Sequence, residues 1–134
     1  MATHRLDPLV RPRSIAVVGA SARAGSPGNE VLVNLRKGGY DGAVFAVNPS
    51  ADAVLGYTAY ATLSDLPQVP QHVVFAVSDG RLEACLEEAI VLGVEAATVF
   101  SALYLDDDTD PPLRQRVQDK AAAAGLLLHG GNCM

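Results

Sequence analysis

The sequence predicts an α/β domain: a doubly wound, mainly parallel sheet of about five strands with helices on both faces. Short apolar, β-branched runs alternate along the chain with longer segments of helical periodicity. The apolar runs are nearly continuous, which is typical of strands covered on both faces. The length of 134 residues suits one domain, and a composition of 49% hydrophobic and 19% charged residues provides for a buried core.

Five apolar runs are expected to form the strands, and the order of elements makes the sheet parallel. The runs are Ser14–Val18, Ala43–Val47, His72–Val77, Ala96–Phe100 and Leu126–Leu128. Between the second and third runs we expect a short extra strand around Gly56–Tyr57. One helical turn near Leu63–Leu66 should follow it.

Three helices are expected between these strands. The first begins near Gly28–Glu30 and ends at Gly38-Gly39. In the second, apolar residues recur from Leu82 to Ile90 at the spacing of one buried face, with Ser78 or Asp79 as the cap and Gly93 at the end. The third opens at Asp110 before two prolines and stops at Gly125.

Charge and cysteine content exclude several classes of function. A net charge of −5 argues against general nucleic-acid binding, which requires a basic surface. The start of the chain is charged, and no apolar run is long enough for a membrane span. Cys85 and Cys133 lack metal-ligand spacing, and two cysteines indicate a reducing compartment. We therefore expect a cytoplasmic protein with no disulfide framework and no metal site.

The loop after the first strand is the strongest candidate for a binding site. It runs from Gly19 to Asn29 as GASARAGSPGN, between a buried strand and a helix start. Small residues let the backbone approach a phosphate, and a helix start offers N–H groups and a positive dipole end. Ser21 and Ser26 add hydroxyl groups, and Arg23 adds a forked cation. This combination favours a phosphate cradle over a tight turn without a ligand.

The nucleotide class is narrowed by what the loop lacks. The spacing of Gly19, Gly25 and Gly28 differs from the GxGxxG of NAD folds, and no P-loop lysine follows. An NAD site also expects an acid after the second strand, where this chain has Asn48-Pro49. A minimal NAD(P)-binding Rossmann enzyme therefore remains only an alternative, beside a non-binding regulatory or interaction domain.

Several segments together resemble a known family. The runs RPRSIAVVGASARAGSPGN, AVNP, VLGYTAYATLSDLP, FAV and HGGNCM are similar, in this order, to the N-terminal CoA-binding domain of NDP-forming acyl-CoA synthetases, relatives of the succinyl-CoA ligase α subunit. The same domain opens some bacterial lysine acetyltransferases. The similarity covers Leu6 to Met134, and it implies one CoA-binding, Rossmann-like domain over residues 1–134, with 1–12 as an N-terminal extension.

The resemblance implies coenzyme A or acyl-CoA as the cofactor and assigns residues to its parts. The loop around its phosphates corresponds to Gly19, Ala20, Ser21, Arg23, Gly25, Ser26 and Gly28. The corner beside the adenosine corresponds to Val47, Asn48 and Pro49, and the strand end beside the pantetheine to Val77 and Ser78. It also implies further domains or subunits: phosphohistidine and ATP-grasp domains, or an acetyltransferase module. A homo-oligomer is a further possibility.

Two departures from the family pattern stand out. This chain ends its last motif as Gly130-Gly131-Asn132-Cys133-Met134, where relatives usually have GPNC. Ser101-Ala102 is followed by Leu103, where a glycine is common.

We find no catalytic set in the chain. His4 lies at the start, His72 opens a buried strand, and His129 follows the last strand without an orienting partner. The acidic turn Asp106–Asp110 and the glutamates from Glu83 to Glu88 are interpreted as solvated surface. The sequence therefore predicts a module that binds the cofactor but is not catalytic alone, with an acyl-CoA synthetase or acetyltransferase as the parent protein.

Overall fold

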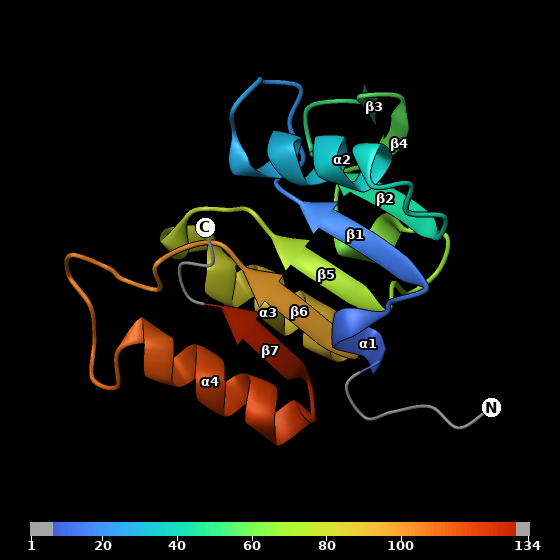
Figure 1. Ribbon diagram of the computed structural model, residues 1–134. Helices are drawn as coiled ribbons and strands as arrows, with labels where there is room; N and C mark the ends of the chain where they lie inside the picture. The colour runs from blue at the N-terminus through green and yellow to red at the C-terminus, as the bar shows by residue number, and fades with distance from the viewer. Residues whose placement is uncertain (1–6, 131–134) are drawn as a thin grey trace.

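The computed structural model describes residues 7–130, which form one seven-stranded sheet with helices packed on it (Figure 1). The strands are β1 (Ser14–Val18), β2 (Ala43–Val47), β3 (Ala53–Val54), β4 (Tyr57–Tyr60), β5 (His72–Phe75), β6 (Ala96–Val99) and β7 (Leu127–Gly130). The helices are α1 (Asp7–Val10), α2 (Pro27–Lys37), α3 (Asp79–Leu92) and α4 (Leu113–Ala124), with a 3-10 turn, η1, at Leu63–Asp65. The predicted fold class is confirmed.

The sheet has the order β3-β4-β2-β1-β5-β6-β7, and every pair except β3–β4 is parallel. All five residues of β1 are buried, as the continuous apolar run predicts. The chain moves outward from β1 to β2 and β4, then returns to place β5 on the other side of β1. Ligands in such sheets bind at this switch point, beyond the carboxyl ends of the strands.

An edge hairpin of β3 and β4 brings the sheet to seven strands: β4 is the short extra strand expected around Gly56–Tyr57, and β3 was not predicted. The tip of the hairpin is Leu55-Gly56, both with positive φ (51° and 84°), a combination found in tight hairpin turns. Arg36 of α2 donates to the carbonyl of Leu55 and stacks 4.9 Å from the ring centroid of Tyr57. The hairpin is therefore held by the end of α2 as well as by β2.

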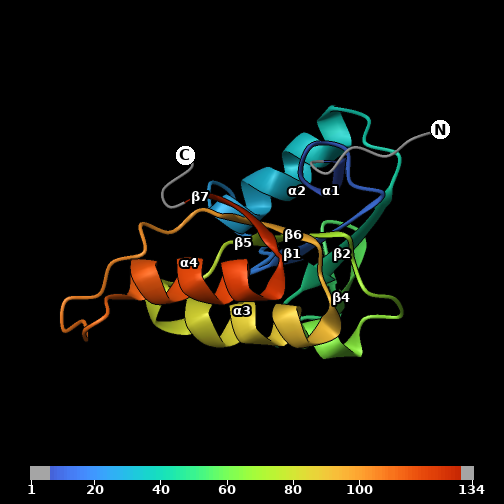
Figure 2. The same cartoon turned by 90° about the horizontal axis from the view of Figure 1, so that it is seen from below.

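The helices cover both faces of the sheet, as expected for a doubly wound fold. Figure 2 shows α2 and α1 on one side and α3 and α4 on the other. Leu32 of α2 and Leu82 and Leu86 of α3 are fully buried between helix and sheet. Each such side chain contributes about 1.5–3 kcal/mol of burial free energy. In the described part of the chain, no helix has the length and apolar character that a membrane crossing requires.

The start of α4 corrects one prediction. Asp110 was expected to open this helix, but the helix begins at Leu113 after the two prolines. The carboxylate of Asp108 accepts from the backbone N–H of Leu113 at 2.9 Å. This contact lowers the pKa of the Asp108 carboxyl, because the N–H stabilises its charged form. The acidic turn is thus a helix cap and not only solvated surface.

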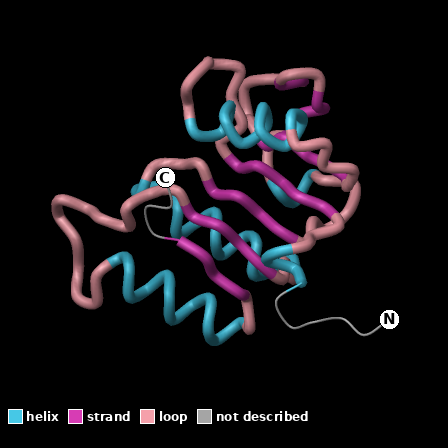
Figure 3. Tube along the Cα trace, in the orientation of Figure 1, coloured by secondary structure: helices cyan, strands magenta, loops and turns pink. Residues whose placement is uncertain are grey.

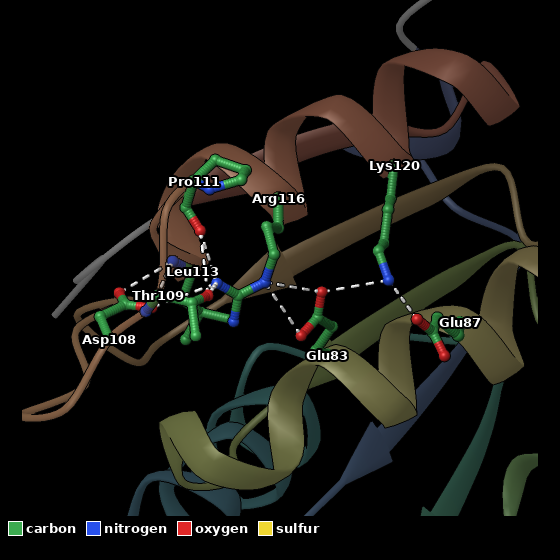
Figure 4. A network of polar contacts seen from close by, with 8 residues as sticks. All are labelled: Glu83, Glu87, Asp108, Thr109, Pro111, Leu113, Arg116 and Lys120. Carbon is green, nitrogen blue, oxygen red and sulfur yellow. Dashed lines mark hydrogen bonds and ion pairs between the residues drawn. The ribbon is translucent and has the colours of Figure 1, made fainter.

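The glutamates of α3 lie at the surface, as predicted, but Glu83 and Glu87 also tie α3 to α4 (Figure 4). Arg116 of α4 lies 3.1 Å from a Glu83 carboxylate oxygen and 3.1 Å from Asp108. Lys120 lies 3.1 Å from Glu83 and also pairs with Glu87. Both carboxylates on this face of α3, Glu83 and Glu87, are therefore paired with cations of α4.

The segment before β1 contains the short helix α1, which the sequence did not predict. The carbonyl of Pro8 lies 3.0 Å from Nδ1 of His72, and Nε2 of His72 lies 2.8 Å from the Thr98 hydroxyl. Burial lowers the pKa of His72, so the ring stays neutral near pH 7. His72 therefore connects this segment to the sheet, and both its nitrogens have partners.

Candidate functional site

Two glycines allow unusually close backbone contacts at the carboxyl end of β1. A Cβ atom on Gly19, whose φ is +91°, would lie 2.2 Å from the carbonyl oxygen of Ala76, just after β5. A Cβ on Gly28 would lie 2.0 Å from the carbonyl oxygen of Gly19. Only glycine fits such contacts. The ends of β1 and β5 and the start of α2 are therefore packed backbone against backbone.

The loop between these glycines is braced from inside. The hydroxyl of Ser26 donates to the carbonyl of Arg23 at 2.8 Å, and the backbone N–H of Arg23 donates to the Ser21 hydroxyl at 3.0 Å. Gly25 has φ +86° and open space around it, so it serves the turn alone. Ser26 is buried and shapes the loop, whereas its neighbour Arg23 is exposed.

Two asparagine amides hold the loop from outside. Nδ2 of Asn48, after β2, donates to the carbonyl of Ala20 at 3.0 Å, and its Oδ1 accepts from the N–H of Ser50 at 2.8 Å. Nδ2 of Asn29 donates to the carbonyl of Ser21 at 3.0 Å. Asn48 was predicted from the sequence, whereas the role of Asn29 was not. An asparagine as the third residue of a helix gives no sequence signal for a contact with the preceding loop.

The first turn of α2 keeps free hydrogen-bond donors. Pro27 has no N–H, and the first turn of a helix leaves its N–H groups without intrahelical partners. Ser26 stands at the N-cap position, but its side chain makes no capping bond. No other described side chain caps the N–H groups of Gly28 and Asn29. This turn fits an anion, because donors and the positive dipole end face the same point.

A crevice of about 350 Å³ lies at the carboxyl ends of β1 and β2. Five residues predicted for the site line it: Gly19, Ala20, Val47, Asn48 and Pro49. The other predicted residues do not: Ser21, Arg23, Gly25, Ser26, Gly28, Val77 and Ser78 lie on the loop or just beyond β5, outside this lining. Figure 3 shows the loops that meet at this edge of the sheet.

The rest of the crevice lining includes residues that the sequence did not indicate as site residues. They are Arg81, Cys85 and Glu88 of α3, together with Thr62 before η1. Cys85 is half-buried: it lies at the crevice wall and also packs against the core between α3 and the sheet. Burial raises the pKa of its thiol, which therefore stays protonated at neutral pH. The spacing of 81, 85 and 88 places these residues on one helix face, but the sequence alone does not indicate that this face borders the crevice.

Three other hollows have similar sizes: two of about 460 and 510 Å³ at the amino ends of the strands, and one of about 420 Å³ beside Tyr40 and His72. None of the three is lined by a residue of the predicted site. In the described part of the chain, no group of three or more His, Cys, Asp and Glu side chains could hold a metal ion. The crevice beside the loop of β1 is therefore the candidate site.

In the loop after β6, Leu103 adopts a backbone conformation that glycine usually occupies. Leu103 has φ +61°, a left-handed conformation that costs a non-glycine residue about 1–2 kcal/mol. The carboxylate of Asp79 accepts from the N–H of Leu103 at 3.0 Å and of Tyr104 at 3.2 Å. Of the two residues expected at the cap of α3, Ser78 occupies the N-cap position, and Asp79 instead holds this loop. Ser101 has a buried hydroxyl with no partner among the described residues.

The remaining candidates do not form a catalytic set. His129 is exposed at the end of β7. His4, Cys133 and the rest of the terminal Gly131–Met134 motif lie outside the described residues.

Comparisons with known proteins agree on one relationship. The sequence model of a family described as "CoA binding domain" matches residues 13–134. The ADP-forming acetate–CoA ligase II of Archaeoglobus fulgidus is 29% identical over 95% of this chain but 19% of its own length. The chain thus spans about a fifth of the length of the curated relatives it matches in this way.

Solved structures give the same result. A dinucleotide-forming acetyl-coenzyme A synthetase 1 of Candidatus Korarchaeum cryptofilum, in complex with phosphate and ADP, has a TM-score of 0.86 and 29% identity over 95% of this chain and 27% of that one. A hypothetical protein of Pyrococcus horikoshii has a TM-score of 0.76 and 29% identity over 99% of this chain and 88% of that one. The fold thus occurs both within long synthetases and in a chain of comparable size.

Proposed function

Because this chain belongs to the CoA-binding domain family, like the first part of ADP-forming acyl-CoA synthetases, we propose that it holds coenzyme A or acyl-CoA for a reaction completed elsewhere. Residues 1–134 would form one cofactor-binding domain, with 1–12 as an N-terminal extension. The single observation that carries the proposal is the geometry after β1. There the backbones of β1, β5 and α2 meet at Gly19 and Gly28, and the N–H groups of Gly28 and Asn29 in the first turn of α2 are free to donate to a ligand.

The diphosphate of the cofactor would lie against the loop Gly19–Gly28 and the start of α2. The N–H groups of Gly28 and Asn29 would donate to its oxygens, and Arg23 would supply a charge. Gly19 and Gly28 permit this position, since a side chain at either would fill the space between the backbones. Ser26 would act indirectly, by fixing the carbonyl of Arg23.

The adenosine would occupy the crevice beside Val47, Asn48 and Pro49. Proline offers a rigid apolar edge for the base, and the second N–H of the Asn48 amide can donate to it. The pantetheine would then leave the crevice past Val77 and Ser78, toward the loop held by Asp79. This direction supports a thiol presented at the carboxyl edge of the sheet.

The chemistry would come from other domains or subunits. The described residues of this chain contain no nucleophile with an orienting base, and long ligases match over about a fifth of their length. The named relatives are a ligase and a synthetase, which favours a synthetase context over an acetyltransferase one. Binding of the cofactor, and not turnover, is the activity we assign to the chain itself.

Calorimetric titration of the chain with CoA, and separately with NAD, tests the proposal. We expect saturable binding of CoA and much weaker binding of NAD, since no acid follows β2 to hold the ribose hydroxyls. Arg23→Ala should weaken CoA binding by about 1.5–3 kcal/mol, and Arg13→Ala, at the opposite edge of the sheet, should not. No binding at millimolar CoA by a folded chain would reject the proposal.

A further inference from the structure

Arg81 is an exposed cation in the crevice wall with no side-chain hydrogen bond or ion pair in the described chain. It is the third residue of α3 and lines the crevice opposite the corner of Asn48 and Pro49. Its guanidinium makes no hydrogen bond or ion pair with a described residue. An arginine without a partner, in a hollow at the ligand-binding edge of the sheet, is available to an anion from solution.

The carboxylates of α3 explain why Arg81 stays unpaired. Glu83 and Glu87 point to the other side of the helix and pair with Arg116 and Lys120 of α4 (Figure 4). Glu88 does line the crevice, but seven residues of helix separate it from Arg81 by a rise of about 10 Å.

The carboxylate of Glu88 also has a partner of its own, because the Ser64 hydroxyl donates to it at 2.8 Å. The crevice end near Arg81 is therefore locally positive in a chain with a net charge of −5. A ligand group that binds there should be anionic and should fit a planar, forked donor, as a phosphate does.

This inference rests on the proposed function, which puts the diphosphate at the start of α2 and the adenosine beside Asn48. Coenzyme A carries one more phosphate, on the 3′ oxygen of its ribose. We propose that Arg81 binds this 3′-phosphate and thereby makes the crevice select 3′-phosphorylated adenine nucleotides over their unphosphorylated counterparts. Arg81 is a specificity-determining residue in this view, and Arg23 serves the diphosphate that both kinds of ligand share.

The test is a cycle of two proteins and two ligands. CoA and dephospho-CoA, which lacks only the 3′-phosphate, are titrated into the wild-type chain and into Arg81→Gln. The wild type should bind CoA about 10- to 100-fold more tightly than dephospho-CoA, as expected for a charge-assisted bond to phosphate. In Arg81→Gln this preference should fall to about twofold or less, through weaker CoA binding alone.

Matched variants give the controls. Arg13→Gln makes the same change of charge at the amino edge of the sheet and should keep the full preference. Arg81→Lys keeps the charge but loses the fork, so it should retain an intermediate preference that added salt weakens. Circular dichroism confirms that each variant is folded before its affinities are compared.

The outcomes separate this inference from the proposed function. Equal binding of both ligands by the wild type would overturn the role of Arg81 and leave CoA binding intact. An equal loss for both ligands in Arg81→Gln would overturn it too, because Arg81 would then serve the diphosphate. Binding of neither ligand by the folded wild type would refute the proposed function itself, and this inference with it.

Discussion

Replacing Gly28 by alanine tests the backbone contact on which the site depends. Gly28 is the second residue of α2, where alanine would ordinarily raise helix stability by up to about 1 kcal/mol. Here the new Cβ would lie 2.0 Å from the Gly19 carbonyl oxygen, so α2 and β1 must separate by at least about 1 Å to restore a tolerable contact. Overpacking of this kind costs about 1–3 kcal/mol. We expect a net loss of about 2 kcal/mol.

Gly80 provides a matched control for this substitution. It is the second residue of α3, and a Cβ there would meet nothing within 4 Å. Gly80→Ala should therefore leave stability unchanged or raise it by up to about 1 kcal/mol. The two variants share the same change and the same helix position, so their difference isolates the contact with Gly19.

Urea unfolding at pH 7 measures both variants, with thermal unfolding as a second readout. A loss of about 2 kcal/mol corresponds to a drop in Tm of about 6–10 °C for a chain of this size. CoA affinity should fall in Gly28→Ala as well, because the donors of the first turn move with the helix. A Gly28→Ala protein as stable as the wild type, or more stable, would refute the reasoning.

Three further predictions concern other parts of the site and its supports. Leu103→Gly should relieve the strain of a left-handed residue but lose a buried side chain, for a net loss of about 2 kcal/mol in urea unfolding; a gain in stability would contradict this account of the loop. Asn48→Asp should lose the donor to the Ala20 carbonyl and place charge against it, weakening CoA binding in calorimetry; unchanged affinity would show that the brace is dispensable. The N–H of Leu113 holds the pKa of Asp108 below its usual value near 4, so the charged carboxylate stabilises the folded chain above about pH 4. This stabilisation is lost as the pH falls through the lowered pKa of the folded state. The unfolding free energy should therefore decline in that range, and less steeply in Asp108→Asn.

Most of the fold could be predicted from local hydrophobic patterns, because each buried strand or helix face is formed by apolar residues within one short segment. Ser14–Val18 is the clearest case, since its continuous apolar run matches a strand buried on both faces. The strand beside Gly56 was found only as a hint. Its pairing partner, Ala53–Val54, is only two residues long. The turn between them needs a positive φ at Leu55, a conformation that a leucine in the sequence does not predict.

The site was predictable where the chemistry lies on one loop and not where it comes from several elements. Gly19 and Gly28 could be identified because glycine itself is the signal. Arg81 could not, since its availability depends on where Glu83 and Glu87 find partners, and those partners lie 33 residues away. The ion pairs between α3 and α4 could not be predicted for the same reason, because the pattern of one helix shows only that its glutamates face solvent.

A titration of isotope-labelled chain with CoA, followed by amide NMR shifts, addresses the central claim most directly. If the turn after β1 receives the phosphates, the largest shifts should fall on the N–H groups of Gly28 and Asn29, with further shifts around Asn48 and Arg81. Shifts confined to the amino edge of the sheet, for example around Gly93, would contradict it, as would a spectrum that CoA leaves unchanged.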